Sequence, residues 1–106
     1  MWFIFPQFAG LGHSPMARRF AISSREEAVA YLGHGVLGPQ LRECTALVSA
    51  VESRTIREIL GSPDDLKFCS SMTLFGEVAS DAVFAAAIAK FHGGRSDRRT
   101  LDLLAH

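Results

Sequence analysis

The sequence predicts an all-α fold, a compact single-domain bundle of about six to seven mostly short helices. Apolar residues recur at intervals of three and four along most of the chain, which is the spacing of one helix face. No stretch alternates apolar and polar residues for long enough to indicate a strand. Short groups of glycine, serine and proline separate the periodic stretches, as helix ends require. Because the chain shows neither a repeat nor a linker, residues 1–106 are expected to form one helical domain.

The central helix is expected to run from Pro63 to about Ala79. Ser62 supplies a hydroxyl that can accept an orphan amide, proline suits the first helical position, and two aspartates follow at the positive end of the helix. One stripe of this helix is expected to be core; it consists of Phe68, Met72, Phe75 and Ala79, with Cys69 beside it.

Shorter helices are expected on either side of the central one, because capping residues and glycine stops recur along the chain. The expected segments are Ser14 to about Ala21, 25–32 after Ser23 or Ser24, 39–52 after Gly38, 55–60 ended by Gly61, a helix capped by Ser80 or Asp81 and stopped at Gly93, and a final turn or two capped by Asp97. In the segment 39–52 the inward side is expected to hold Leu41, Cys44, Leu47, Val48 and Val51, with Thr45 on the other side.

Composition excludes several classes of protein. The 11 basic and 11 acidic residues cancel, so a general nucleic-acid surface has no electrostatic support. The apolar opening meets Pro6 at once and lacks a basic start, which argues against a signal peptide, and no run approaches the roughly 20 apolar residues of a membrane span. A cytoplasmic location is therefore expected. The two cysteines and four histidines lack metal-ligand spacing, so we expect free thiols, no metal and no cofactor.

The only dense group of polar residues lies along one edge of the central helix and consists of Asp64, Lys67 and Ser71. With Gln7 and Arg42 from neighbouring segments, this edge is a candidate site for a small anionic or nucleotide-like ligand, because a lysine and helix-start amides attract anions. The alternative is structural: the two aspartates cap the helix, and Asp64 pairs with Lys67 three residues on.

Two groups of residues contain side chains that could act in catalysis. Lys67 precedes Ser70 and Ser71 by one helical turn, but a lysine must be strongly desolvated before it can act as a base. Either Cys44 or Cys69 could pair with His34, although thiols on apolar helix faces are typically inert. No catalytic residue is assigned, and the chain is expected to be a binding or interaction module rather than an enzyme.

Residues 2–5 are all large and apolar, so they must be buried on more than one side. Either later helices cover this segment or a second copy or partner does, which predicts possible self-association as a homodimer. Trp2 and Phe5, beside Gln7, could also stack on a planar ring.

Several motifs resemble those of the bacterial domain-of-unknown-function 1810 family, whose members are sometimes labelled calpastatin-like. They are Trp2-Phe3-Ile4-Phe5-Pro6-Gln7, Gly10-Leu11-Gly12, Leu37-Gly38, Leu41-Arg42-Glu43-Cys44, Gly61-Ser62-Pro63-Asp64-Asp65-Leu66-Lys67 and Ser70-Ser71-Met72-Thr73-Leu74-Phe75. The resemblance runs from Trp2 to about Leu104. It implies a small, mainly helical cytoplasmic protein with no established activity.

The calpastatin label has no support in these residues, because nothing resembles a disordered protease-inhibitor repeat. The resemblance also suggests one departure from the family. Its members usually carry a further helical segment before the Trp-Phe-Ile-Phe-Pro-Gln motif, with which this chain begins. Without that segment the surface around Trp2 to Phe5 is expected to lack part of its cover, which would favour self-association.

Overall fold

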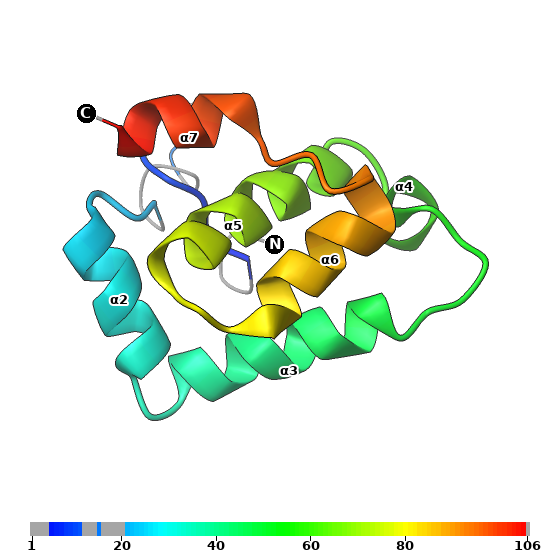
Figure 1. Ribbon diagram of the computed structural model, residues 1–106, viewed down its shortest axis with the longest axis horizontal. Helices are drawn as coiled ribbons and strands as arrows, with labels where there is room; N and C mark the ends of the chain where they lie inside the picture. Colours follow the sequence, from blue (N-terminus) through cyan, green and yellow to red (C-terminus); the bar gives the residue numbers. More distant parts are fainter. Residues whose placement is uncertain (1–4, 12–14, 16–20, 106) are drawn as a thin grey trace.

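Helices make up most of the chain in the computed structural model, which describes residues 5–11, 15 and 21–105. They are α2 (Arg25–Gly33), α3 (Leu37–Ser49), α4 (Ile56–Leu60), α5 (Asp64–Val78), α6 (Ala82–His92) and α7 (Arg98–Leu104), as Figure 1 shows. Extended pairing within the described residues is limited to one bridge between Phe8 and Ile22. The all-α prediction is confirmed, whereas most of the helix expected from Ser14 lies outside the described residues.

The helix ends follow the capping residues that the sequence indicated. The predicted caps Ser24, Asp81 and Asp97 precede α2, α6 and α7, and the side chain of each accepts a hydrogen bond from a backbone amide in the first turn. Thr55, which was not predicted as a cap, does the same for α4. Gly93 ends α6 with φ of 61°, a left-handed conformation that suits glycine. Local chemistry therefore determines where these helices begin and end.

The start of α5 differs from the prediction. The helix begins at Asp64, after a cis Ser62–Pro63 peptide bond, and no side chain caps it. The expected Ser62 cap is therefore wrong. Backbone carbonyls replace it: the Gly61 carbonyl accepts from the Asp65 amide at 2.9 Å, and the Pro63 carbonyl accepts from the Leu66 amide at 3.1 Å.

Helix α5 lies at the centre of the molecule. It packs against α2, α4, α6 and α7, so neighbours cover it on several sides (Figure 1). The predicted core stripe is confirmed at Phe68, Met72 and Phe75, which are at most 1% exposed. Burial extends beyond that stripe, because every residue from Ser70 to Phe75 is buried.

Aromatic contacts join α5 to its neighbours. The ring of Phe68 meets Phe5 edge to face, with ring centroids 5.0 Å apart, and meets Phe91 of α6 at 6.1 Å. Phe75, two turns further along, lies 5.8 Å from Phe84. Phe5 is thus part of the core, as one reading of the apolar N-terminus predicted. Trp2 to Ile4 lie outside the described residues, so self-association through them stays a prediction.

The buried face of α3 differs from the prediction at two positions. Leu47, expected inside, is 63% exposed, and Thr45, expected outside, is fully buried. Thr45 follows Leu41 by four residues and shares its face, and its hydroxyl donates to the Leu41 carbonyl at 2.8 Å. Because that hydrogen bond satisfies the hydroxyl inside the helix, a threonine can occupy a core position here.

Candidate functional site

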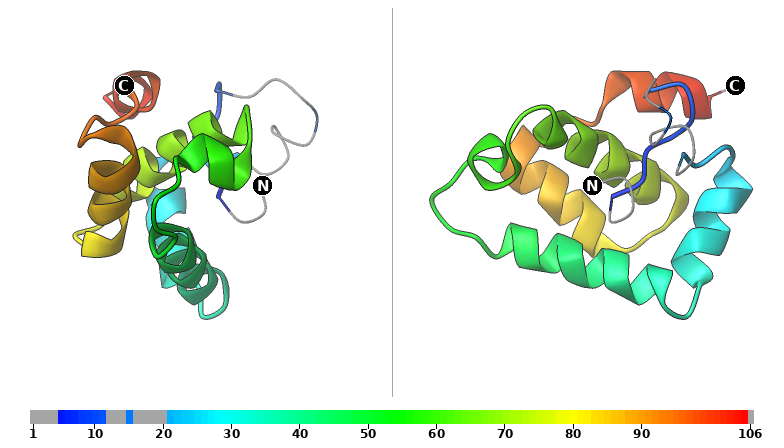
Figure 2. Two further views of the ribbon diagram at one scale, coloured as in Figure 1. Left: turned by 90° about the vertical axis from the view of Figure 1, so that its right-hand side faces the viewer. Right: turned by 180° about the vertical axis from the view of Figure 1, so that it is seen from behind.

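A pocket of about 300 Å³ lies where the N-terminal half of α5 meets the start of α7 and the segment 7–11. Figure 2 shows this segment from behind, running across α5 toward α7. The pocket is lined by Gln7, Leu11, Pro63, Leu66, Lys67, Ser70, Asp97 and Arg99. Two of the predicted site residues, Gln7 and Lys67, therefore line one pocket although they are distant in sequence.

Two cationic side chains line the pocket from different helices. Lys67 belongs to the first turn of α5, and Arg99 to the first turn of α7. Among the described residues that line the pocket, Asp97 carries the only carboxylate, beside these two cations. Two cationic side chains favour an anionic ligand. The planar guanidinium of an arginine can bind a phosphate or carboxylate with two hydrogen bonds.

Asp97 is held rigidly at the edge of the pocket. Its Oδ2 accepts from the Thr100 amide at 3.1 Å, from the Thr100 hydroxyl at 2.6 Å and from Ser70, whose Oγ lies 3.2 Å away. Its own amide donates to the Thr73 hydroxyl at 2.7 Å. These bonds tie the start of α7 to the middle of α5, so the pocket wall is set by the packing of two helices.

Gln7 reaches the pocket because its segment is paired with a later one. The Ile22 amide donates to the Gln7 carbonyl, and the Ala9 amide donates to the Ile22 carbonyl, both at 2.8 Å. This pairing holds the segment beside α5, and Gln7 is 9% exposed. Gln7 therefore adds to the pocket lining a side-chain amide that has both donors and an acceptor.

The serine at the pocket is Ser70, not the predicted Ser71. Ser70 Oγ lies 3.2 Å from both the Leu66 carbonyl and Asp97 Oδ2, and its single proton can be donated to one of them at a time. Ser71 is fully buried, and its hydroxyl has no hydrogen-bond partner among the described residues. Asp64 is half-buried at the start of α5 and is not among the residues that line the pocket.

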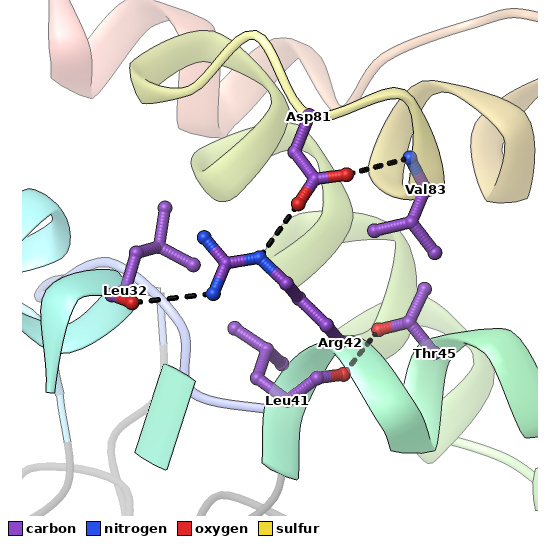
Figure 3. A network of polar contacts seen from close by, with 6 residues as sticks. All are labelled: Leu32, Leu41, Arg42, Thr45, Asp81 and Val83. Carbon is purple, nitrogen blue, oxygen red and sulfur yellow. Dashed lines mark hydrogen bonds and ion pairs between the residues drawn. The ribbon is translucent and has the colours of Figure 1, made fainter. Parts of the chain in front are cut away.

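Arg42 is not among the residues that line the pocket and instead joins three elements (Figure 3). Its Nε donates to Asp81 Oδ2 at 2.6 Å, and one of its terminal nitrogens donates to the Leu32 carbonyl at 3.3 Å. Asp81 in turn accepts from the Val83 amide at 3.2 Å. This network links α3 to the end of α2 and the start of α6. The structure therefore does not bring Arg42 together with Gln7 and Lys67.

Asp81→Asn is expected to remove about 1 kcal/mol of stability at pH 7, because Asn keeps the cap on Val83 but loses the charge that faces Arg42. The pKa of Asp81 lies below its ordinary value of 3.8. The larger cause is the hydrogen bond from Arg42, and the next is the hydrogen bond from the Val83 amide. A lowered folded pKa stabilises the protein above pH 3.8, and that contribution is lost as the pH falls through the folded value. Urea denaturation at pH 7 and pH 3 should show the difference between the two proteins shrinking in acid.

The control for that experiment is Asp102→Asn, because Asp102 pairs with Arg98 on an exposed helix face. Its effect should be small at both pH values. An Asp81→Asn protein as stable as the wild type at pH 7 would contradict the structural role of the Arg42 network.

The two cysteines are free and half-buried. Burial raises the pKa of the Cys69 thiol to about 11, and the nearby Asp97 carboxylate adds to the rise, so this thiol is protonated at neutral pH. His34 Nδ1 accepts from the Val36 and Leu37 amides, both at 3.1 Å, and holds the turn between α2 and α3. That nitrogen is thus engaged by the backbone and is not available as a base for a thiol.

Sequence reasoning did not place Ser70, Asp97 or Arg99 at a ligand site. The sequence indicates Asp97 only as a helix cap, and Arg99 is not among the predicted site residues. No local signal could have joined Asp97 and Arg99 to Lys67, because the pocket forms only when α7 packs on α5. Within the described part of the chain, no helix is long and apolar enough to cross a bilayer, and no three His, Cys, Asp or Glu side chains gather as a metal site.

Comparison with known proteins gives a family match and a structural match. The model of a family described as protein of unknown function (DUF1810) matches residues 1–104. The crystal structure of the conserved hypothetical protein Rv1873 from Mycobacterium tuberculosis is similar, with 58% sequence identity and a TM-score of 0.97 over 99% of this chain and 76% of that one. Among curated proteins, none is significantly similar.

Proposed function

This chain belongs to the DUF1810 family, and we propose that it is a binding module whose pocket between α5 and α7 holds a small anionic ligand. The observation that carries the proposal is the convergence of Lys67 and Arg99 on one pocket beside the buried Gln7. Two helices and an N-terminal segment each contribute one of these groups, so the fold positions all three.

The pocket wall suits a ligand with an apolar body. Leu11, Pro63 and Leu66 line the same pocket as the charged groups. Ligand pockets are typically walled by apolar side chains, with a few polar groups that orient the ligand. The volume of about 300 Å³ lies at the lower end of the range for such pockets, which favours a small metabolite over a dinucleotide.

The hydrogen-bond partners of Ser70, the serine in the pocket, favour binding over catalysis. The acceptors near the Ser70 hydroxyl are the Leu66 carbonyl and the Asp97 carboxylate. Asp97 Oδ2 already accepts two hydrogen bonds from Thr100. An activated serine needs a base that can take its proton, and a carboxylate oxygen saturated by other donors is a poor one. The hydrogen bonding of Ser70 therefore supports ligand binding, and not catalysis, as the role of the pocket.

Arg99→Gln is expected to weaken binding of an anionic ligand about fivefold, because one charge-assisted contact is lost. The probes are inorganic phosphate, citrate, adenosine monophosphate and sn-glycerol 3-phosphate, each titrated against isotope-labelled protein and followed by NMR. Saturable shifts are expected at Lys67, Ser70 and the first turn of α7. Binding should weaken as salt is added, since the contacts are charged.

The matched control is Arg98→Gln, which removes the same charge from the adjacent position. Arg98 pairs with Asp102 on an exposed face and does not line the pocket. The Arg98 variant should bind as the wild type does. Absence of saturable shifts with every probe, or equal weakening by the two arginine variants, would refute the proposed site.

A further inference from the structure

The carboxylate of Asp97 is an unexpected group in a pocket that otherwise favours anions. It is half-buried and lines the same pocket as Lys67 and Arg99. A ligand that is only an anion gains from the two cations but is repelled by this carboxylate. The proposed binding function therefore leaves the role of Asp97 in the pocket unexplained.

The hydrogen bonds of Asp97 leave one of its oxygens for the ligand. Among the described residues, the Thr100 amide and hydroxyl donate to Oδ2, and the Ser70 hydroxyl lies within hydrogen-bond distance of the same oxygen. None of these bonds uses Oδ1. Because Oδ2 is fixed by α7 and α5, the position of Oδ1 is fixed with it. Among its described lining residues, the pocket thus has two cationic side chains and one carboxylate whose Oδ1 is held in a fixed position.

We propose that Asp97 selects the ligand class: small organic phosphates that also carry a hydroxyl or ammonium donor. This inference rests on the proposed anion site. A donor placed against Oδ1 forms a charge-assisted hydrogen bond, whereas a phosphate without a donor meets an unpaired negative charge. Specificity then comes from both an attraction and a repulsion at the same oxygen.

Two matched probe pairs test this selection. Glycerol 3-phosphate and n-propyl phosphate share charge and chain length, and only the first has hydroxyl donors. O-phosphoethanolamine and ethyl phosphate form the corresponding pair for an ammonium donor. In at least one pair, the wild-type protein should bind the donor-bearing phosphate about tenfold more tightly, the effect of one hydrogen bond to a charged group.

Asp97→Asn should reduce that ratio to about twofold or less, because the charge-assisted hydrogen bond is lost. The Thr100 donors hold the amide oxygen in the place of Oδ2, so the amide nitrogen takes the place of Oδ1 and presents a donor where the wild type has an acceptor. Asparagine caps helices as well as aspartate does, so the variant should melt near the wild-type temperature. Asp102→Asn, on the exposed face of the same helix, is the control and should leave the ratio unchanged.

The outcomes separate the two proposals. Equal binding within both pairs by the wild type, or a ratio that survives Asp97→Asn, would overturn the selection by Asp97 and leave the anion site standing. Failure of every phosphate to bind would overturn the anion site, and the selection with it. A preference for the donor-bearing phosphate that disappears in Asp97→Asn and persists in Asp102→Asn would support both.

Discussion

Phe68→Ala should lower the free energy of unfolding by about 3–5 kcal/mol, the usual cost of emptying a buried phenylalanine site. Phe68 is 1% exposed, and its ring contacts Phe5 and Phe91, so its loss would leave a cavity between α5, α6 and the N-terminal segment. Domains of this size are commonly stable by only about 5–15 kcal/mol. Urea denaturation followed by circular dichroism would measure the loss.

Leu66→Ala is the control, because Leu66 lies on the same helix but is 66% exposed. It should change the free energy of unfolding by no more than about 0.5 kcal/mol. Should the Phe68 variant not fold at all, Phe68→Leu retains most of the apolar volume and should give a measurable, smaller loss. A Phe68→Ala protein within 1 kcal/mol of the wild type would be inconsistent with a packed core at this position.

Gly38→Ala should cost about 3 kcal/mol, at the upper end for an inserted methyl group, because the atoms in its way belong to the backbone. A Cβ at Gly38 would lie 2.1 Å from the Leu32 carbonyl oxygen and 2.9 Å from its carbon. That oxygen also accepts the hydrogen bond from Arg42. The end of α2 must therefore move away from α3, and the Arg42 contact is lost with it. Thermal unfolding and amide hydrogen exchange in α2 would report both effects.

Gly33→Ala provides the comparison, from the end of α2 that faces the start of α3 along the chain. A Cβ at Gly33 would meet nothing within 4 Å, and the residue ends α2, so alanine should be neutral or stabilising by up to about 1 kcal/mol. If Gly38→Ala were as stable as Gly33→Ala, the close approach of α2 and α3 would be refuted. Retention of the α2 exchange protection in the Gly38 variant would count against it in the same way.

Local signals predicted the helices well, because each acts within a few residues of chain. Asp81 and Asp97 begin helices at the positions expected of them, and Gly93 ends α6. The wrong prediction at Ser62 also concerns only a few neighbouring residues. The Gly61 carbonyl, and not the Ser62 side chain, accepts the hydrogen bond at the start of α5. Sequence reasoning could not choose between these two acceptors, since either one satisfies the amide.

The candidate site was only partly predictable. Gln7 and Lys67 do line one pocket, whereas Arg42 lies with Asp81 in a separate network and Ser71 is enclosed in the core. A helical wheel gives the angle of each side chain about its own axis but not which sides its neighbours cover. Because α5 is central, Ser71 was covered and Ser70 came to line the pocket.

The sequence by itself determined the all-α class, most helix boundaries and the aromatic stripe of α5, since capping hydrogen bonds and apolar periodicity are written within single segments. Only the tertiary structure decided that α7 lies against α5, and hence that Lys67, Asp97 and Arg99 share a pocket. The physical reason is that contacts between helices depend on how apolar faces from distant segments fit together. That fit is a property of the whole packed core.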